Sequence, residues 1–216
     1  VQLRVERQPS GGQSGGAAMT PSAFWWSAAG FFLAALWLIQ RWRSGWVWFF
    51  VSVLCAAVVG IIPLAGHTPR FWLGGLASNA SVPLLVLLAV SVIQRASGLV
   101  LFRSREWRTA WIFGAVASLA LYPSALGLGL RNFDAYSLGW PWLQWWPSLF
   151  LFGAVGWAAG ALVWRGNRFG WVLAASAGAY WLRVQESNNF WDYLLDPLFG
   201  AVSLVAVVLL VLRRAR

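Results

Sequence analysis

Seven long apolar segments follow one another along this chain, and each is about as long as a helix that crosses a membrane. A helix of about 20 apolar residues spans the hydrocarbon core of a bilayer. The segments cover residues 24–40, 46–65, 72–94, 109–130, 147–164, 169–182 and 189–212. They take up most of the 216 residues, which leaves no room for a separate soluble domain. The sequence therefore predicts an all-α fold, a polytopic transmembrane helical bundle of about seven spans.

The composition agrees with this class and argues against two others. Apolar residues make up 60 % of the chain and charged residues 10 %, whereas soluble domains carry roughly 25 % charged residues. The net charge of +10 comes from arginines that are spread over short turns and form no continuous basic stripe. This spacing argues against nucleic acid as a partner and favours contact with membrane lipid.

The arginines also predict an orientation, because cationic loops stay on the cytoplasmic side during insertion. Counting alternate turns places three arginines on one side, at positions 70, 131 and 183. The other side receives eleven, at positions 41, 43, 95, 103, 105, 108, 165, 168, 213, 214 and 216. The second side is therefore predicted to be cytoplasmic, with the N-terminus outside and the C-terminus inside.

The first 18 residues differ from the rest of the chain. They are rich in Gly, Ser and Gln, and such a segment buries too little apolar surface to order itself. We expect a disordered tail over 1–18, with Met19 as a possible true start, and a single transmembrane helical domain over 19–216. All basic residues are arginine, and Ala, Gly and Trp are abundant. This usage favours a GC-rich bacterial genome. With the predicted spans, it leads us to expect a multi-pass protein of the bacterial inner (cytoplasmic) membrane.

Two local features interrupt the simple picture of straight spans. The segment 72–94 is broken in its first half by Gly, Ser, Asn and Pro, so that only 82–94 is solidly apolar. The short apolar stretch 98–102 lies among arginines, and we expect it to lie along the membrane interface. Pro123 marks an expected kink in the fourth span. The solitary Cys55 lies in an apolar run and is expected to pack as a small buried residue.

Tryptophan is unusually frequent, with 18 residues, most of them near the ends of predicted spans. Indole rings settle at the level of the lipid headgroups, so an interfacial belt explains most of them. One outer loop carries a dense run that could instead form an aromatic platform for a sugar or a lipid headgroup. This run contains Trp140, Trp142, Trp145 and Trp146.

The acidic residues are the sharpest indication of a functional site. Four of the six fall at the predicted outer face: Asp134, Glu186, Asp192 and Asp196. Asp192 and Asp196 are spaced i, i+4 and share a face if the seventh helix begins near Asn189. Paired carboxylates can hold a cation or divide acid and base roles between them. Asp134 and its neighbours could converge with Glu186 and Asp192 into one pocket.

A structural explanation stands beside the functional one. Acidic residues near a helix N-terminus are stabilised by the helix dipole. Asn188 or Asn189 is a natural N-cap, and Arg131 and Arg183 are plausible ion-pair partners. The same polar residues could also bind a substrate together with the tryptophan run.

Motifs of familiar catalytic classes do not occur in the sequence. It contains no serine nucleophile elbow, no HExxH, no phosphate-binding Gly-Lys loop and no CxxC. We therefore expect neither a metal nor a cofactor, and whether the chain is an enzyme stays open.

Three functions remain. The first is an accessory or assembly subunit of the bacterial inner membrane, whose polar outer face contacts a membrane or periplasmic protein partner or a lipid-linked intermediate. The alternative is a membrane-embedded enzyme that acts at the outer face on a lipid-linked or periplasmic substrate. It would use Asp192, Asp196, Glu186 or Asp134. The second alternative is a small-solute carrier, which the broken third segment suggests.

Overall fold

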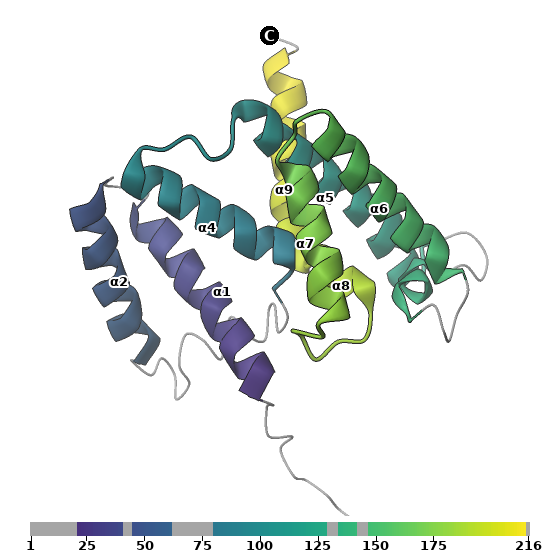
Figure 1. The fold of residues 1–216 in the computed structure, drawn as a ribbon, viewed down its shortest axis with the longest axis horizontal. Coiled ribbons are helices and arrows are strands. Elements are labelled where there is room, and N and C mark those ends of the chain that lie inside the picture. Colours follow the sequence, from purple (N-terminus) through teal and green to yellow (C-terminus); the bar gives the residue numbers. More distant parts are fainter. Residues whose placement is uncertain (1–20, 41–44, 62–79, 129–133, 142–146, 215–216) are drawn as a thin grey trace, which may run out of the picture.

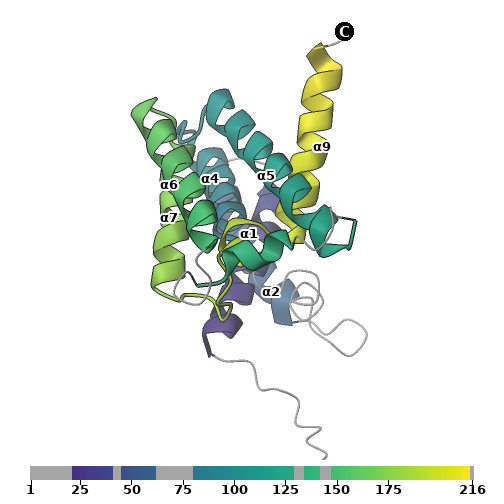
Figure 2. The same cartoon turned by 90° about the vertical axis from the view of Figure 1, so that its right-hand side faces the viewer.

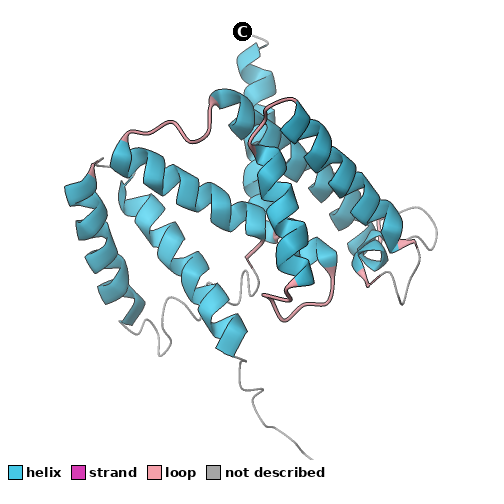
Figure 3. Cartoon of the chain, in the orientation of Figure 1, coloured by secondary structure: helices cyan, strands magenta, loops and turns pink. Residues whose placement is uncertain are grey.

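The computed structural model describes residues 21–40, 45–61, 80–128, 134–141 and 147–214. The regular secondary structure of these residues is helical, and they contain no strand (Figure 3). The prediction of an all-α fold is confirmed for this part of the chain. The tail 1–18 and the first half of the third segment lie outside the described residues.

The helices match most of the predicted spans to within a few residues. In chain order they are α1 (Pro21–Gln40), α2 (Trp46–Ile61), α4 (Val82–Ser97), α5 (Ser104–Ala125), the 3-10 helix η1 (Ala135–Gly139), α6 (Ser148–Trp164), α7 (Phe169–Trp181), α8 (Phe190–Leu194) and α9 (Pro197–Arg214). Helix α4 begins where the solidly apolar stretch was predicted to begin, because Ser81 has extended backbone and caps the helix. Pro123 lies in the last turn of α5, so it acts close to the end of this helix.

Two helix pairs and one group of three form the molecule. Helices α5 and α9 pack against each other, α6 packs along α7, and α1 contacts both α2 and α4 (Figures 1 and 2). Helix α4 connects the group of α1, α2 and α4 to the other helices through its contacts with α7, α8 and α9.

Small residues allow α5 and α9 to approach closely. A Cβ atom added to Gly114 would lie 2.2 Å from the hydroxyl of Ser203, and one added to Gly200 would lie 2.6 Å from that of Ser118. Each helix thus places a glycine opposite a serine of the other. Glycine and serine three or four residues apart on one helix face are typical of helix contacts inside membranes, where close backbone packing replaces the hydrophobic effect.

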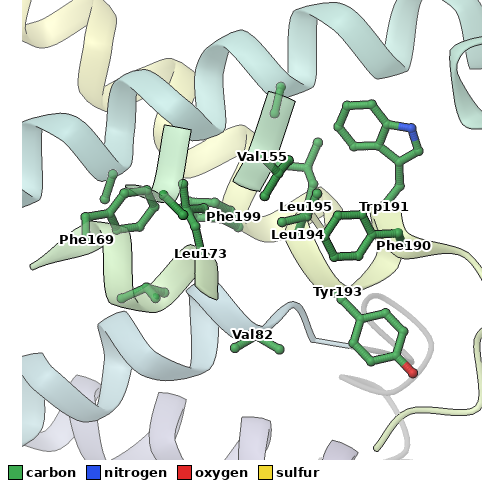
Figure 4. Packing of buried hydrophobic residues seen from close by; sticks show 14 of the residues in the cluster. Val82, Val155, Phe169, Leu173, Phe190, Trp191, Tyr193, Leu194, Leu195 and Phe199 are labelled. Carbon is green, nitrogen blue, oxygen red and sulfur yellow. The ribbon is translucent and has the colours of Figure 1, made fainter. Parts of the chain in front are cut away.

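The core lies between α5, α6, α7, α8 and the start of α9 (Figure 4). Phe169, Phe190, Tyr193 and Phe199 are each fully buried there. The ring of Phe190 stacks on that of Phe152, with centroids 4.3 Å apart. This cluster fixes the positions of α6, α7, α8 and the start of α9 relative to one another.

Many large apolar side chains are exposed on the outward surface of the helices. Helix α9 exposes most of its aliphatic side chains, including Val205 at 59 % and Val211 at 61 %. Helices α2, α5 and α6 likewise expose Phe50, Ile112 and Trp157. Contiguous apolar patches of this kind mark contact with a membrane or another protein.

Length and apolarity together single out one helix among the described residues. Only Pro197–Arg214 is both long and apolar enough to cross a membrane, and four other apolar helices are shorter. A 16-residue helix such as α2 is about 24 Å long, less than the roughly 30 Å of a hydrocarbon core. The structure therefore supports membrane association weakly and does not establish seven spans.

Two predictions about local structure are wrong. The predicted seventh span is not continuous from Asn189, because Leu195 has extended backbone and separates α8 from α9. The solitary Cys55 is exposed on α2 and does not pack as a buried residue.

The two ends of the bundle differ in charge. The turn between α6 and α7, the segment before α5 and the C-terminal end of α9 lie toward one end (Figures 1 and 2). This end, which we call the arginine end, carries Arg103, Arg105, Arg165, Arg168, Arg213 and Arg214. Helix η1, helix α8 and the first turn of α9 lie toward the other, the acidic end, together with Asp134, Asp192 and Asp196.

Candidate functional site

A polar cluster closes the acidic end and joins three segments that are distant in the sequence. Its members are Ser81 at the start of α4, Tyr136 in η1, and Gln185, Ser187, Asn189, Asp192 and Asp196 around α8. Several of these side chains are buried, and hydrogen bonds between them replace contact with water.

Asp196 is the most completely hydrogen-bonded member, with its side chain 3 % exposed. One carboxylate oxygen accepts the backbone N–H groups of Leu198 and Phe199, both at 2.9 Å, and so caps α9. The other accepts the N–H of Ser81 at 2.9 Å and its hydroxyl at 2.5 Å. The N-terminal ends of α4 and α9 thus converge on one anion, which two helix dipoles stabilise. Asp196 therefore holds two helices together.

Asp192 lies in a different environment and is half-buried. One of its oxygens accepts a hydrogen bond from the Tyr136 hydroxyl at 3.0 Å and another from the Ser187 hydroxyl. Its other oxygen accepts none from the described residues. Burial, together with the negative charge of Asp192 and the hydrogen bond to it, raises the pKa of Tyr136 to about 12. At neutral pH this phenol is therefore a hydrogen-bond donor that keeps its proton.

Asn189 fixes helix α8 to η1. Its side-chain oxygen accepts the N–H of Trp191 at 3.0 Å, so Asn189 is the N-cap of α8. The sequence predicts Asn188 or Asn189 for this role. The amide nitrogen of Asn189 donates to the carbonyl of Tyr136 at 2.9 Å. Gly139 must lack a side chain here, because a Cβ atom would lie 1.7 Å from the Asn189 oxygen. The indole of Trp191 adds a bond to the Ala135 carbonyl at 2.8 Å.

A second set of hydrogen bonds holds the loop that precedes α8. The hydroxyl of Tyr193 accepts the N–H of Gln185 at 3.2 Å and faces the carbonyls of Gln185 and Ser187. The side-chain amide of Gln185 donates to Ala80 at 3.0 Å, next to the cap of α4. The loop and both helix ends are thus held as one unit.

The two outer segments meet through the hydrogen bond between Tyr136 and Asp192, but the predicted carboxylate pair on one helix face is not found. Asp192 and Asp196 do not share a helix face, since the chain is extended at Leu195 between them. They contact different partners, Tyr136 in one case and Ser81 in the other. Within the described ranges, no ion pair joins either carboxylate to Arg183; the ion pair found there joins Arg105 and Glu106.

The remaining predicted site residues lie at the surface or outside the described ranges. Asp134 is exposed and accepts the N–H of Tyr136 at 2.9 Å. Glu186 and Asn188 are exposed beside the cluster, as is Arg183, whose φ of 49° is left-handed. Trp140 is 43 % exposed, and its ring meets the Tyr136 ring edge-on. Arg131, Trp142, Trp145 and Trp146 lie outside the described residues.

Sequence reasoning missed Ser81, Gln185, Ser187 and Gly139. Ser81 had a readable signal, since Ser followed two residues later by Pro83 is a typical helix start. The same holds for Asp196 directly before Pro197. Gln185, Ser187 and Gly139 had no local signal, because their roles depend on contacts with other segments.

The arrangement can bind and position groups more readily than it can transfer protons. Both oxygens of Asp196 are fully used, whereas one oxygen of Asp192 accepts no hydrogen bond within the described part of the chain. No three His, Cys, Asp or Glu side chains within the described ranges come close enough together to hold a metal ion. Comparison with protein families, curated sequences and solved structures finds no match for this chain.

Proposed function

We propose that this chain is a multi-pass protein of a bacterial inner membrane, with about seven spans, the N-terminus outside and the C-terminus inside. The apolar outward faces of α2, α5, α6 and α9 support the embedding. The gathering of arginines at one end and of carboxylates at the other supports the orientation.

We further propose that it acts as an accessory or assembly subunit whose acidic end contacts a partner protein or a lipid-linked intermediate. One observation carries this proposal. The most deeply buried carboxylate of the cluster, Asp196, uses both of its oxygens to hold α4 and α9. The acidic end is therefore suited to be a rigid surface, with Asp134, Arg183, Glu186 and Asn188 exposed at its edge.

Photo-crosslinking in native membranes tests the contact. A benzoylphenylalanine placed at Arg183 or Asn188 should yield a discrete adduct, of protein size for a partner or of small mass for a lipid-linked intermediate. Ile112 on α5 is the control, because its side chain is 53 % exposed but lies away from the acidic end. The proposal is wrong if the outer positions give the same lipid adducts as Ile112.

Cysteine labelling tests the embedding and the orientation separately. In a Cys55→Ser background, Asn188→Cys should react with an impermeant maleimide in intact cells, and Arg165→Cys only after permeabilisation. The reverse pattern would overturn the orientation, and labelling of neither position until the cells are permeabilised would argue against membrane insertion.

An enzyme that acts on a lipid-linked or periplasmic substrate is the second candidate, and one observation favours it. Asp192 is half-buried, has one carboxylate oxygen that accepts no hydrogen bond from the described residues, and contacts the protonated phenol of Tyr136, whose ring meets that of Trp140. For an enzyme, Asp192→Asn should abolish function while the membrane level of the protein stays normal. Asp134→Asn, which removes an exposed carboxylate nearby, should leave function unchanged.

A further inference from the structure

The arginine end carries a surface that the proposed function does not use. It is formed by the segment between α4 and α5 and by the turn between α6 and α7, which hydrogen bonds lock together. Arg168 donates to the carbonyls of Val100, at 3.3 Å, and Leu101, while Arg105 donates to Gly166 at 2.8 Å. Asn167 adds a bond to the Thr109 hydroxyl at 2.8 Å. These bonds give the surface a defined shape before any ligand binds.

Positive charge on this surface is nearly uncompensated. Arg103, Arg105, Arg165 and Arg168 are all exposed. Of the acidic residues in the described ranges, only Glu106 lies here. It is 3 % exposed and bonded to the backbone N–H of Arg103 at 2.8 Å. Within the described ranges, Arg103 and Arg165 donate no side-chain hydrogen bond, so their guanidinium N–H groups have no competing partner there for a ligand.

Exposed apolar side chains lie directly beside these cations. Leu99 is 61 % exposed and Val100 is 63 % exposed, in the same segment whose carbonyls Arg168 holds. Trp164, next to Arg165, is 92 % exposed. Aliphatic and indole groups at the edge of a membrane insert among acyl chains and headgroups. Binding of a soluble polyanion would not account for these exposed apolar side chains.

We infer that this surface binds the headgroup of an anionic phospholipid, with the arginines on the phosphate and Leu99, Val100 and Trp164 against the acyl chains. The inference rests on the proposed membrane embedding but not on the partner contact at the opposite end. Guanidinium groups match phosphate oxygens in a bidentate fork. The prior bonding of the two loops lowers the ordering cost of the site.

Native mass spectrometry of the full chain in detergent micelles tests the inference, with phosphatidylglycerol and phosphatidylcholine as the probes. Arg103→Gln/Arg165→Gln should weaken phosphatidylglycerol binding about 30-fold, since each arginine near an anionic surface contributes about 1 kcal/mol. Arg213→Gln/Arg214→Gln is the matched control, because it removes the same charge from the last turn of α9. Equal loss in the two double variants, or equal binding of the two lipids by the parent chain, would overturn the site.

A second comparison separates a lipid from free phosphate. Leu99→Ser/Val100→Ser should weaken phosphatidylglycerol binding while all arginines remain in place. If this variant binds the lipid as well as the parent, and millimolar inorganic phosphate displaces the lipid, the surface is a phosphate site and the lipid assignment is wrong. Flotation with phosphatidylcholine vesicles keeps this failure distinct from a failure of the embedding, because only a chain that is not membrane-embedded would remain unfloated.

Discussion

Replacement of Asp196 is the perturbation whose effect can be worked out most fully from the structure. Asp196→Ala removes the cap of α9, which is worth about 1 kcal/mol. It also removes two bonds from Ser81 to a charged acceptor, each worth about 1.5 kcal/mol or more. The free energy of unfolding should therefore fall by about 4 kcal/mol. This is a large effect for one side chain, because the donors left behind are buried.

Asp196→Asn distinguishes the lost charge from the lost geometry. Its single oxygen can still cap α9 through the N–H groups of Leu198 and Phe199, but its amide then faces the N–H of Ser81, donor against donor. We expect a loss of about 2 kcal/mol, between the parent and the alanine variant.

Unfolding in mixed micelles, followed by circular dichroism, measures both losses. Asp134→Ala is the control, since this exposed residue caps only the short η1 and should cost less than about 1 kcal/mol. An Asp196→Ala variant that unfolds within about 0.5 kcal/mol of the parent would refute the reasoning. So would a loss in Asp134→Ala as large as that in Asp196→Ala.

Three further predictions follow from single positions. Gly139→Ala should destabilise the acidic end by more than about 2 kcal/mol, because its Cβ would lie 1.7 Å from the Asn189 side chain; thermal unfolding checks this. Gly114→Ala should lower the free energy of unfolding by about 1–3 kcal/mol, because its Cβ would lie 2.2 Å from a serine hydroxyl of α9. Gly156→Ala is the control and should not lower it, because nothing lies within 4 Å of its Cβ. The same unfolding assay compares the two variants. The pKa of Tyr136 is about 12 in the folded chain and about 10 in the unfolded chain. Its stabilising contribution is therefore complete below pH 10 and lost as the pH rises from 10 through 12. Tyr136→Phe should flatten this part of the stability-versus-pH curve, and an unchanged slope would contradict the assignment.

The helices were largely predictable because their signal is local. Apolar runs of the right length, bounded by arginines, placed α6 and α7 within one or two residues. The break between α8 and α9 was missed because the i, i+4 spacing of Asp192 and Asp196 was given more weight than Pro197. A proline directly after an aspartate starts a helix more often than it continues one.

The site was predictable in outline and not in detail. Charge counting brought Asp134 and Asp192 to the same end, and the structure joins their segments through Tyr136. Charge counting could not show that Asp196 accepts hydrogen bonds from Ser81, because that pairing depends on how α4 crosses the bundle. Long-range partners of this kind leave no periodic signal in the sequence.

The bond between Ser81 and Asp196 also fixes an order of events during synthesis. The two residues are 115 positions apart. At a translation rate of about 5–20 residues per second, roughly 6–23 s pass between the synthesis of one and of the other. During this interval the first turn of α4 lacks the acceptor that it has in the finished chain. Helix α9 thus completes the acidic end, and a chain truncated before α9 would keep that end open to proteolysis.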